Sequence, residues 1–454
     1  MTWLRYPLNI VRQLNDSFRI NCAYSRGGAF FVLGMLMLML YAVSKEIAPQ
    51  LSRIAEGFFI FTGMMIFLAT RQIRSSIWGW MLAILIVIQL LSWASAMLSH
   101  PEWSSRFPPV DRLAKSLLFI PIGLLLAGSL RNALVLWCFF VLGLLLAIFS
   151  YSGGVAYWVS GFHGARLDFG IQNAAHPAMF FAVIFLVNIT MVKDILFPYG
   201  SWQWGRTIVW LISSAISLLI VYFTQTRGVI LGLLLSLSVV SCIWIFRHIN
   251  VVFRRRNLFF IVPVVFVASV LGYKLFGIVE MRQASETNDI TTMQKVGLAS
   301  APDSSIIIRL KLWTAAKDRL LERPILGWGD KARNQTIKTA DFIPQQIKDN
   351  FGHLHNLFLD IAVSYGFLGL LAYVLINAFA LGQLYFAWKA SVVSGSMLLL
   401  GIGFTVLWFF INCFESYGLF SSGVFTYAIV WGCLLTKVFL WRYPECFRKY
   451  GLDK

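Results

Sequence analysis

Charged residues are scarce in this 454-residue chain, and so are the local signatures of common enzymes. Asp, Glu, Lys and Arg make up 13% of the sequence, against about 25% in a typical soluble domain. The patterns GxSxG, HExxH and GxxxxGKS/T do not occur. The sequence therefore gives no support for a serine hydrolase, a zinc protease or a P-loop nucleotide hydrolase.

The six cysteines also lack a recognisable pattern. No CxxC pair and no Cys/His spacing typical of a zinc site is present, and none of the cysteines lies in the polar segment 278–356. We therefore expect neither a disulfide framework nor a zinc site.

Long apolar runs dominate the chain instead. Hydrophobic residues make up 58% of it, and the mean hydropathy is +0.73. Because a helix needs about 20 apolar residues to cross a bilayer core, we predict an all-α polytopic membrane protein with about 12 transmembrane helices. The predicted spans cover 28–44, 54–70, 77–98, 113–130, 132–150, 174–192, 207–224, 228–246, 258–277, 357–387, 393–413 and 419–440.

Basic residues gather in three segments of the chain. Each pair of these segments is separated by an even number of predicted spans, so all three lie on the same side of the membrane. These segments are the N-terminal tail, the break after the eighth span and the C-terminal tail. Cytoplasmic segments of membrane proteins are enriched in Lys and Arg, so we expect both termini in the cytoplasm. The net charge of +18 then reflects topology, and no nucleic-acid partner is expected.

One long polar insert interrupts the pattern of spans, and it divides the expected domains. Residues 1–277 are expected to form nine transmembrane helices, and residues 278–356 a large periplasmic loop. Residues 357–454 are expected to form three more helices and a cytoplasmic tail. A long insert of this kind is more often functional than a short turn.

An amphipathic helix is predicted within this loop at residues 304–323. One face of it carries Ile306, Leu310, Trp313 and Lys317 at helical spacing. Ser304 or Ser305 is placed to cap the helix, and Pro324 is placed to end it. Its apolar positions predict that it lies on the membrane surface or on the helix bundle.

Polar residues that border membrane spans are costly, which makes them the first candidates for function. The strongest pattern is HLHNLFLDIAVSYGFLGLL at 353–371, with a His-Asn pair, nine residues, Gly, two residues and Gly. His353 lies two residues before His355, so the two side chains face the same way in an extended segment. Gly366 and Gly369 are expected to divide the long tenth span into a half-helix and a full span.

Three other segments place Arg or His at the same face of the membrane. They are TQTRGVILG with Arg227, IIIRLKLW with Arg309 followed by RPILGWG, and GARLDFGIQNAAHPA with Arg166 and His176. A guanidinium offers a planar fork of donors that suits phosphate oxygens. Further candidates are Asp360, which would orient His355 or line a wet cavity, and Glu415 in the loop after the eleventh span.

Each of these residues also has a structural interpretation. His355 suits a helix cap or an interface anchor, and Arg227 suits a snorkelling side chain at a helix end. Arg309 is equally consistent with an ordinary surface position on an amphipathic helix. The polar segment around Arg166 has the composition of any outer loop.

Taken together, the His-Asn…Gly pattern, the Arg-Gly pair and the Arg…Trp…Pro-x-x-Gly-x-Gly loop resemble those of the bacterial O-antigen ligases, in the O-antigen ligase/polymerase superfamily. The resemblance implies transfer of O-antigen polysaccharide from undecaprenyl pyrophosphate to a sugar of the lipid A-core oligosaccharide. The site would lie on the periplasmic face of the bacterial inner membrane. His355 would be the general base, and Arg227 and Arg309 would bind the pyrophosphate. The expected supporting residues are Arg166, His176, His353, Asn356, Asp360 and Glu415.

No metal and no other cofactor is expected for this reaction. Pyrophosphate is a good leaving group, and arginines can neutralise the charge that develops on it. No paired-carboxylate pattern is visible in the outer segments. Direct attack by an acceptor hydroxyl would invert the anomeric carbon. The expected partners are therefore the lipid-linked donor, the lipid A-core acceptor and membrane lipids.

Other acceptors and one other class of function stay open. An O-antigen polymerase and a protein O-oligosaccharyltransferase use the same donor, and the sequence does not fix the acceptor. A transporter of lipid-linked glycans would carry charges near the middle of its spans and internal repeats. The mid-span regions are mostly apolar and no repeat is visible, which favours the transferase.

Overall fold

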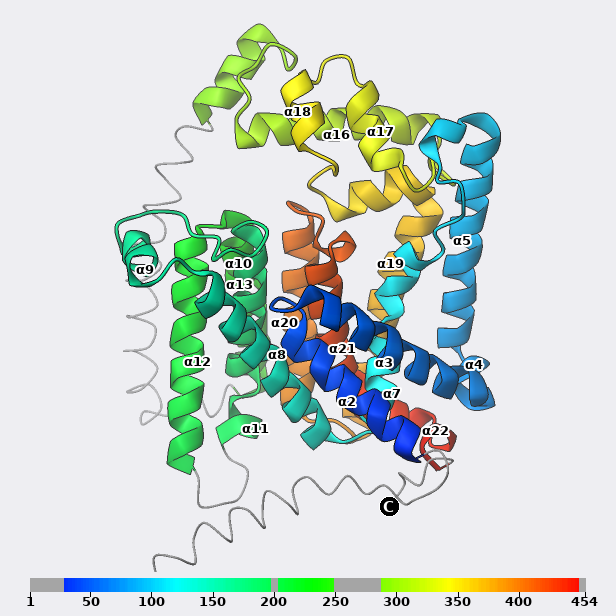
Figure 1. Ribbon diagram of the computed structural model, residues 1–454, viewed down its shortest axis with the longest axis vertical. Helices are drawn as coiled ribbons and strands as arrows, with labels where there is room; N and C mark the ends of the chain where they lie inside the picture. Colours follow the sequence, from blue (N-terminus) through cyan, green and yellow to red (C-terminus); the bar gives the residue numbers. More distant parts are fainter. Residues whose placement is uncertain (1–27, 197–202, 249–286, 449–454) are drawn as a thin grey trace, which may run out of the picture. The chain divides into compact units, whose positions relative to one another are not determined.

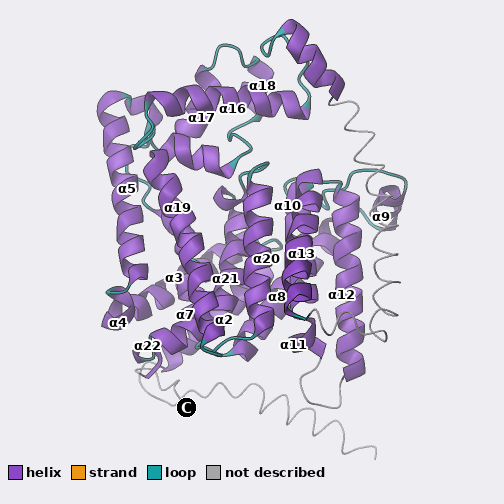
Figure 2. Ribbon diagram, turned by 180° about the vertical axis from the view of Figure 1, so that it is seen from behind, coloured by secondary structure: helices purple, strands orange, loops and turns teal. Residues whose placement is uncertain are grey.

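The computed structural model describes residues 28–196, 203–248 and 287–448. All regular structure in these ranges is helical (Figure 2). Eight of the described helices are long and apolar enough to cross a membrane, which confirms an all-α polytopic membrane protein. They are α3 (Pro49–Ala69), α5 (Ile77–Ser99), α8 (Leu130–Tyr151), α12 (Gln203–Thr224), α13 (Arg227–Arg247), α19 (Leu357–Lys389), α20 (Gly395–Asn412) and α21 (Ser421–Arg442).

Two shorter apolar helices coincide with further predicted spans, α2 (Gly28–Ser44) and α10 (Ala175–Thr190). The predicted ninth span, 258–277, lies outside the described residues. The other named elements are α4 (Arg71–Arg74), η1 (Pro101–Trp103), α6 (Asp111–Ala114), η2 (Lys115–Leu117), α7 (Phe119–Leu125), α9 (Val155–Phe162), α11 (Val192–Leu196), α16 (Ser305–Glu322), α17 (Ala332–Thr339), α18 (Gln345–Asn350), η3 (Tyr417–Leu419) and α22 (Glu445–Arg448).

The span predicted at 113–130 is not one continuous helix. The segment instead contains the end of α6, the 3-10 turn η2 and the seven-residue α7. Pro121 has no N–H to donate to the carbonyl of Leu117, which removes one α-helical hydrogen bond where the segment is divided. Ala127 and Gly128 then end α7 at positive φ angles of 53° and 72°. The prediction was wrong because hydropathy alone does not register these backbone restraints.

The chain divides into two compact units. Unit 1 comprises Met1–Trp80, Leu118–Leu146 and Ala428–Lys454, and unit 2 comprises Met81–Leu117 and Ala147–Tyr427. Within unit 1, α2 and α7 both pack against α3. Within unit 2, α10 packs against α12, and α13 packs against α20.

Small residues bring α13 and α20 close together. A Cβ at Gly232 would lie 2.9 Å from Cγ2 of Ile411, and a Cβ at Gly403 would lie 2.8 Å from Cγ2 of Val240. Ser236 Oγ also donates a hydrogen bond of 2.7 Å to the Gly403 carbonyl. Close backbones and buried hydroxyls of this kind hold membrane helices together. The first turn of α13 is thereby fixed beside the end of α20.

The segment between α13 and α19 has a hydrophobic core of its own. Helices α16, α17 and α18 lie together at one end of α13 and α19 (Figure 1). Their shared core consists of Trp103, Leu312, Ala315, Ala316, Trp328, Ala332, Ile337, Ile343, Ile347, Leu354 and Val363. Leu354 and Val363 flank the His-Asn pair, so this core also holds the start of α19 in place.

The predicted amphipathic helix is confirmed as α16, but its buried face differs from the prediction. The buried residues are Ile307, Lys311, Leu312, Ala315 and Ala316. Lys311 is 1% exposed and is neutralised by Asp303, whose Oδ1 lies 2.7 Å from Lys311 Nζ. Ser304 is the N-cap residue but makes no side-chain capping bond. Pattern reasoning failed here because α16 has a protein core on one side and a cavity on another.

A break in α19 at Gly366 confirms the predicted division of the tenth span. Gly366 has φ 66° and ψ −167° inside an otherwise continuous helix. The RPILGWG segment lies against this break. Trp328 N donates to the Val363 carbonyl at 2.8 Å, and Phe367 N donates to the Pro324 carbonyl at 2.7 Å. This motif therefore has a structural role, since it pairs with the backbone groups that the break exposes.

Candidate functional site

Two histidines and one glutamate form a cluster where α20 ends and α19 begins. His353 Nε2 lies 2.7 Å from Glu415 Oε1, and His355 Nδ1 lies 3.0 Å from Glu415 Oε2. The two imidazole centroids are 4.2 Å apart. The carboxylate thus bridges two residues from the strongest sequence pattern, although it lies 60 positions after His355.

The electrostatics of the cluster fix the ionisation of Glu415. Burial by itself raises the pKa of this carboxyl, but hydrogen bonds from His353 and His355 outweigh it and lower the pKa well below its usual range. The carboxylate is therefore ionised and can only accept hydrogen bonds. It follows that His355 donates from Nδ1, and in the neutral form of the ring the lone pair is then on Nε2.

Asp360 ties together the two loops that carry this cluster. The residue is fully buried. Its Oδ1 accepts a hydrogen bond of 3.1 Å from the Leu354 backbone N–H, and its Oδ2 accepts one from Ser416 Oγ. Leu354 lies between the two histidines, and Ser416 follows Glu415. Asp360 therefore positions the His-Glu-His cluster through the backbone.

Asn356, rather than His355, caps α19. The Asn356 side chain accepts hydrogen bonds from the N–H groups of Phe358 and Leu359 at 3.0 and 3.1 Å. His355 itself has a positive φ of 50°, a conformation uncommon for residues other than glycine. The helix-cap interpretation of His355 is therefore wrong, and the neighbouring position of the motif performs that task.

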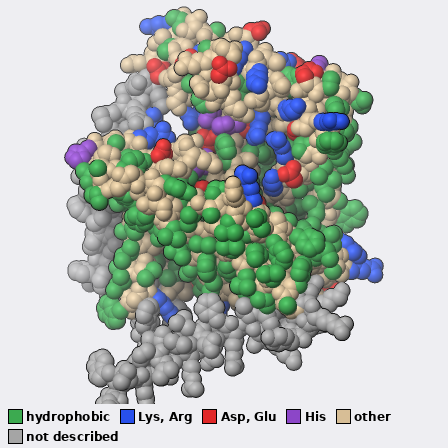
Figure 3. Space-filling view, in the orientation of Figure 1, with side chains coloured by type: hydrophobic (Ala, Val, Ile, Leu, Met, Phe, Trp, Pro, Cys, Tyr) green, Lys and Arg blue, Asp and Glu red, His purple; other side chains and the backbone are tan. Residues whose placement is uncertain are grey.

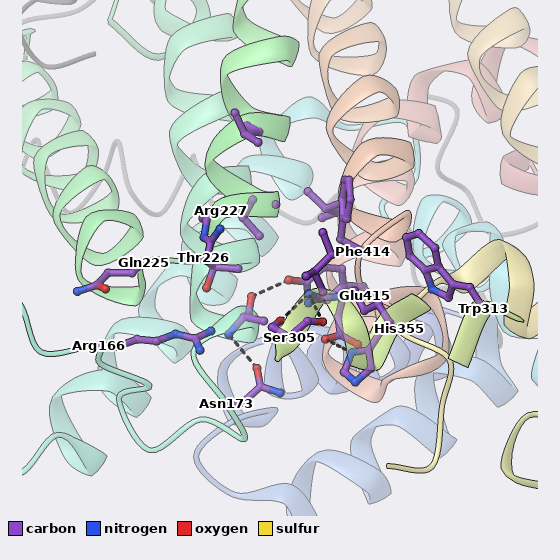
Figure 4. A pocket seen from close by; sticks show the side chains of 18 of the residues that line it. Arg166, Asn173, Gln225, Thr226, Arg227, Ser305, Trp313, His355, Phe414 and Glu415 are labelled. Atoms are coloured by element: carbon purple, nitrogen blue, oxygen red, sulfur yellow. Dashed lines mark hydrogen bonds and ion pairs between the residues drawn. The ribbon is translucent and has the colours of Figure 1, made fainter. Parts of the chain in front are cut away.

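Three arginines, Arg166, Arg227 and Arg309, line a cavity of ≈ 780 Å³ together with His355 and Glu415. Its volume is in the range typical of sites for small ligands. Figure 4 shows Arg166 and Arg227 on one side and His355 with Glu415 on the other. Figure 3 shows a hollow in which histidine and acidic side chains lie beside each other, with basic side chains near its edges. The cavity is lined by Arg166, Asn173, Ala175, Gln225, Thr226, Arg227, Gly228, Val229, Leu231, Ser305, Ile306, Arg309, Leu310, Trp313, His355, Ile411, Phe414, Glu415 and Tyr417.

Local structure positions each arginine. Arg166 Nε donates to the Thr224 carbonyl at 3.0 Å, which holds the loop after α9 against the end of α12. Arg227 is the first residue of α13, so its charge adds to the positive end of that helix dipole. Arg309 Nη1 donates to Ser305 Oγ at 2.7 Å, one turn earlier in α16. The three come from separate segments and converge only in the fold.

Four predicted supporting residues do not line the cavity. His353 and Asp360 hold the lining residues His355 and Glu415 in place, and Asn356 caps α19. His176 is buried, with Nδ1 2.7 Å from Ser422 Oγ. Its ring packs edge-on against Phe420 at 5.1 Å, behind the cluster.

The cluster also has the composition of a metal site. The ligand atoms of His353, His355 and Glu415 lie within 4.8 Å of one another. Two imidazoles and a carboxylate are a ligand set that binds zinc in some enzymes. In this arrangement, His353 Nε2 and His355 Nδ1 are hydrogen-bonded to the Glu415 carboxylate. Metal-free chemistry stays a prediction.

The family model described as O-antigen ligase matches residues 212–374. The matched segment, about a third of the chain, is similar to the O-antigen ligase/polymerase superfamily. Members of that family are glycosyltransferase-like enzymes that act on lipid-linked glycans and acceptors. A search of curated proteins finds no match to the chain.

The matched segment contains part of the lining of the cavity. Arg227, Arg309 and His355 lie inside it, whereas Arg166 and Glu415 lie outside it. Sequence reasoning did not select Gln225, Thr226, Ser305, Phe414 or Tyr417, which also line the cavity. Gln225 and Thr226 are the two residues before Arg227, and Ser305 lies one helical turn before Arg309. Their nearness to a selected arginine could have identified them from the sequence. Nothing in the local sequence marked Phe414 or Tyr417.

Proposed function

We propose that the protein is an O-antigen ligase that transfers O-antigen polysaccharide from undecaprenyl pyrophosphate to a sugar of lipid A-core. The observation that carries this proposal is the placement of His355, bridged to Glu415, in one cavity with Arg166, Arg227 and Arg309. This arrangement offers a base for an acceptor hydroxyl and cationic groups for a pyrophosphate leaving group.

The donor's pyrophosphate would bind at the arginine side of the cavity. As the glycosidic bond to phosphate breaks, negative charge develops on the leaving pyrophosphate. Arg227 and Arg309 would stabilise that charge with directed N–H donors, and Arg166 would support them. In this proposal the three guanidinium groups neutralise the developing charge without a metal ion.

The acceptor hydroxyl would bind at the histidine side. His355 Nε2 would take the proton of the hydroxyl as its oxygen attacks the anomeric carbon, and the configuration of that carbon would invert. The attacking oxygen forms the new glycosidic bond, and the pyrophosphate carrier leaves with the bonding electron pair. Glu415 would orient the imidazole and stabilise the imidazolium that forms.

Apolar walls suit a site that must exclude water. Ile306, Leu310 and Trp313 of α16 line the cavity opposite the end of α20. A dry cavity strengthens the electrostatic interactions within it and limits wasteful hydrolysis of the donor. We place the site on the periplasmic side of the inner membrane, because the three basic segments of the sequence are expected on the cytoplasmic side.

A lipopolysaccharide gel from a deletion strain tests the proposal. Complementation with the wild type should restore O-antigen on the core, and complementation with His355→Ala should not. In the variant, long polymer should accumulate on the undecaprenyl carrier. Core that bears a single repeat unit would indicate a polymerase instead, normal lipopolysaccharide with unglycosylated proteins would indicate a protein O-oligosaccharyltransferase, and an unchanged ladder would exclude a role for His355.

A further inference from the structure

The short helix α9 exposes an apolar stripe that no described part of the chain covers. Val155, Val159 and Phe162 are spaced i, i+4 and i+7, so they lie on one face of the helix. Val155 is 80% exposed and Phe162 is 65% exposed. The helix sequence, VAYWVSGF, contains no charged residue.

The opposite face of α9 is firmly attached to unit 2. Tyr157 Oη accepts hydrogen bonds from the N–H groups of Asp168 and Phe169 at 3.0 and 2.9 Å. A Cβ at Gly161 would lie 2.9 Å from the ring of Phe223, so the helix backbone touches the end of α12. On the stripe itself, one side of the Phe162 ring packs edge-on against Phe223, with centroids 4.8 Å apart, and the rest of the side chain is exposed. The direction of the apolar stripe is therefore fixed by packing.

This stripe continues the exposed apolar surface of neighbouring membrane helices. Trp158 of α9 stacks on Phe149 at the end of α8, with centroids 5.4 Å apart, and Phe149 is 58% exposed. On the other side, Tyr222 and Leu218 are exposed near the end of α12, a helix long and apolar enough to cross the membrane. Figure 1 shows α9 beside this end of α12. The helix thus sits at the level where α12 leaves the bilayer.

We propose that α9 is an interfacial anchor whose Val155–Val159–Phe162 stripe inserts into the lipid bilayer at its headgroup–acyl boundary. The exposed apolar side chains of α9 and its aromatic residues Tyr157 and Trp158 fit this position, because Trp and Tyr are enriched at membrane–water interfaces. A soluble partner protein would leave the continuity with the lipid-facing side chains of α8 and α12 unexplained. A lipid bilayer would cover the exposed apolar side chains of α8, α9 and α12 together.

The anchor has a consequence for the cavity. Only three residues separate the end of α9 from Arg166, and Gln225 Nε2 donates to the Gly164 carbonyl within this link at 2.9 Å. An α9 embedded in the interface therefore holds Arg166 at the depth of lipid headgroups. If the proposed function is correct, this is where the pyrophosphate of a lipid-linked donor lies.

Spin-label accessibility in lipid nanodiscs tests the anchor without any activity assay. Val159→Cys and Phe162→Cys would be labelled in a full-length background whose native cysteines are replaced by serine, after size-exclusion chromatography confirms folding. Ala156→Cys is the matched control, because Ala156 is exposed but lies about a quarter turn of the helix away from the stripe. Collisions with oxygen, which partitions into lipid, are compared with collisions with a water-soluble nickel chelate.

We expect labels at 159 and 162 to favour oxygen over nickel several-fold more than the label at 156. Equal, nickel-accessible labels at all three positions would overturn the anchor, because the stripe would then face water. Labels at 159 and 162 that neither reagent reaches would also overturn it, because the stripe would then be covered by protein. If the stripe faces lipid but the wild-type protein shows no transfer activity, the proposed function fails and the anchor stands.

Discussion

At the scale of single residues, the site depends on a carboxylate that two histidines share. Glu415 accepts hydrogen bonds from both His353 and His355. Its Oε1 also accepts one of 3.0 Å from the backbone N–H of Ser416. This carboxylate fixes which nitrogen of His355 carries a proton. The chemistry proposed for His355 therefore depends on a residue that does not itself react.

Replacing Glu415 should slow transfer without removing the base. We expect Glu415→Gln to lower kcat by about 10- to 100-fold, as is typical when a partner that orients a functional imidazole is lost. His355→Ala should lower it by roughly 10²–10⁴-fold, the usual contribution of general acid–base catalysis. Rates with purified lipid-linked donor and core acceptor measure both. Equal losses for Glu415→Gln and His355→Ala would contradict a purely positioning role for Glu415.

The lowered pKa of Glu415 also predicts how stability depends on pH. A carboxyl whose pKa is lower in the folded state stabilises the fold fully above its unfolded pKa, near 4.5, and loses that contribution as pH falls toward the folded pKa. The difference in melting temperature between wild type and Glu415→Gln should therefore be present at pH 5 and shrink as the pH falls below about 4.5. Thermal unfolding in detergent measures it. A difference that grows below pH 4.5 would contradict the assigned ionisation.

The arginine side of the cavity makes a separate prediction. Arg227→Ala should abolish detectable transfer, and Arg227→Lys should restore only part of it, because an ammonium does not reproduce the donor fork of a guanidinium. Arg247, at the other end of the same helix, provides a control, and Arg247→Lys should retain wild-type activity. Full activity of Arg227→Lys would reduce the role of Arg227 to that of a point charge.

At the scale of secondary-structure elements, the break in α19 is the feature that shapes the site. The backbone of Ile325 and Leu326 crosses Gly366 so closely that a Cβ there would lie 2.1 Å from the Ile325 carbonyl oxygen. The crossing joins the end of α16 to the start of α19. It therefore links the helix that carries Arg309 to the loop that carries His355.

Gly366→Ala should disrupt this crossing. The substitution meets backbone atoms and also requires an unfavourable positive φ of 66°, so we expect a loss of at least ~2 kcal/mol of stability together with loss of transfer. Gly382→Ala in the same helix is the matched control, because nothing lies within 4 Å of its Cβ position. It should be neutral or slightly stabilising. Similar melting temperatures for the two variants would show that the crossing is not rigid.

At the scale of the whole molecule, membrane topology decides which compartment supplies the substrates. Lys338 in α17 and Lys389 at the end of α19 are exposed, and they lie toward opposite ends of the long helix α19 in unit 2. A membrane-impermeant maleimide should label Lys338→Cys in intact spheroplasts and Lys389→Cys only after lysis. The reverse pattern would place the cavity on the cytoplasmic side and contradict the proposed donor.

The sequence by itself determined the class of the protein and most of its helices. Repeated apolar runs of bilayer length favour membrane-spanning helices, because backbone N–H and C=O groups without hydrogen-bond partners are too costly in lipid. The sequence also marked the three arginines and His355, since polar residues at span ends are exceptional in an apolar chain. Tertiary structure alone decided that Glu415 bridges two histidines, that Asn356 is the cap and that α16 turns Ile306, Leu310 and Trp313 toward the cavity. These outcomes depend on contacts between residues far apart in the chain, and helical periodicity carries no information about which neighbour each face will meet.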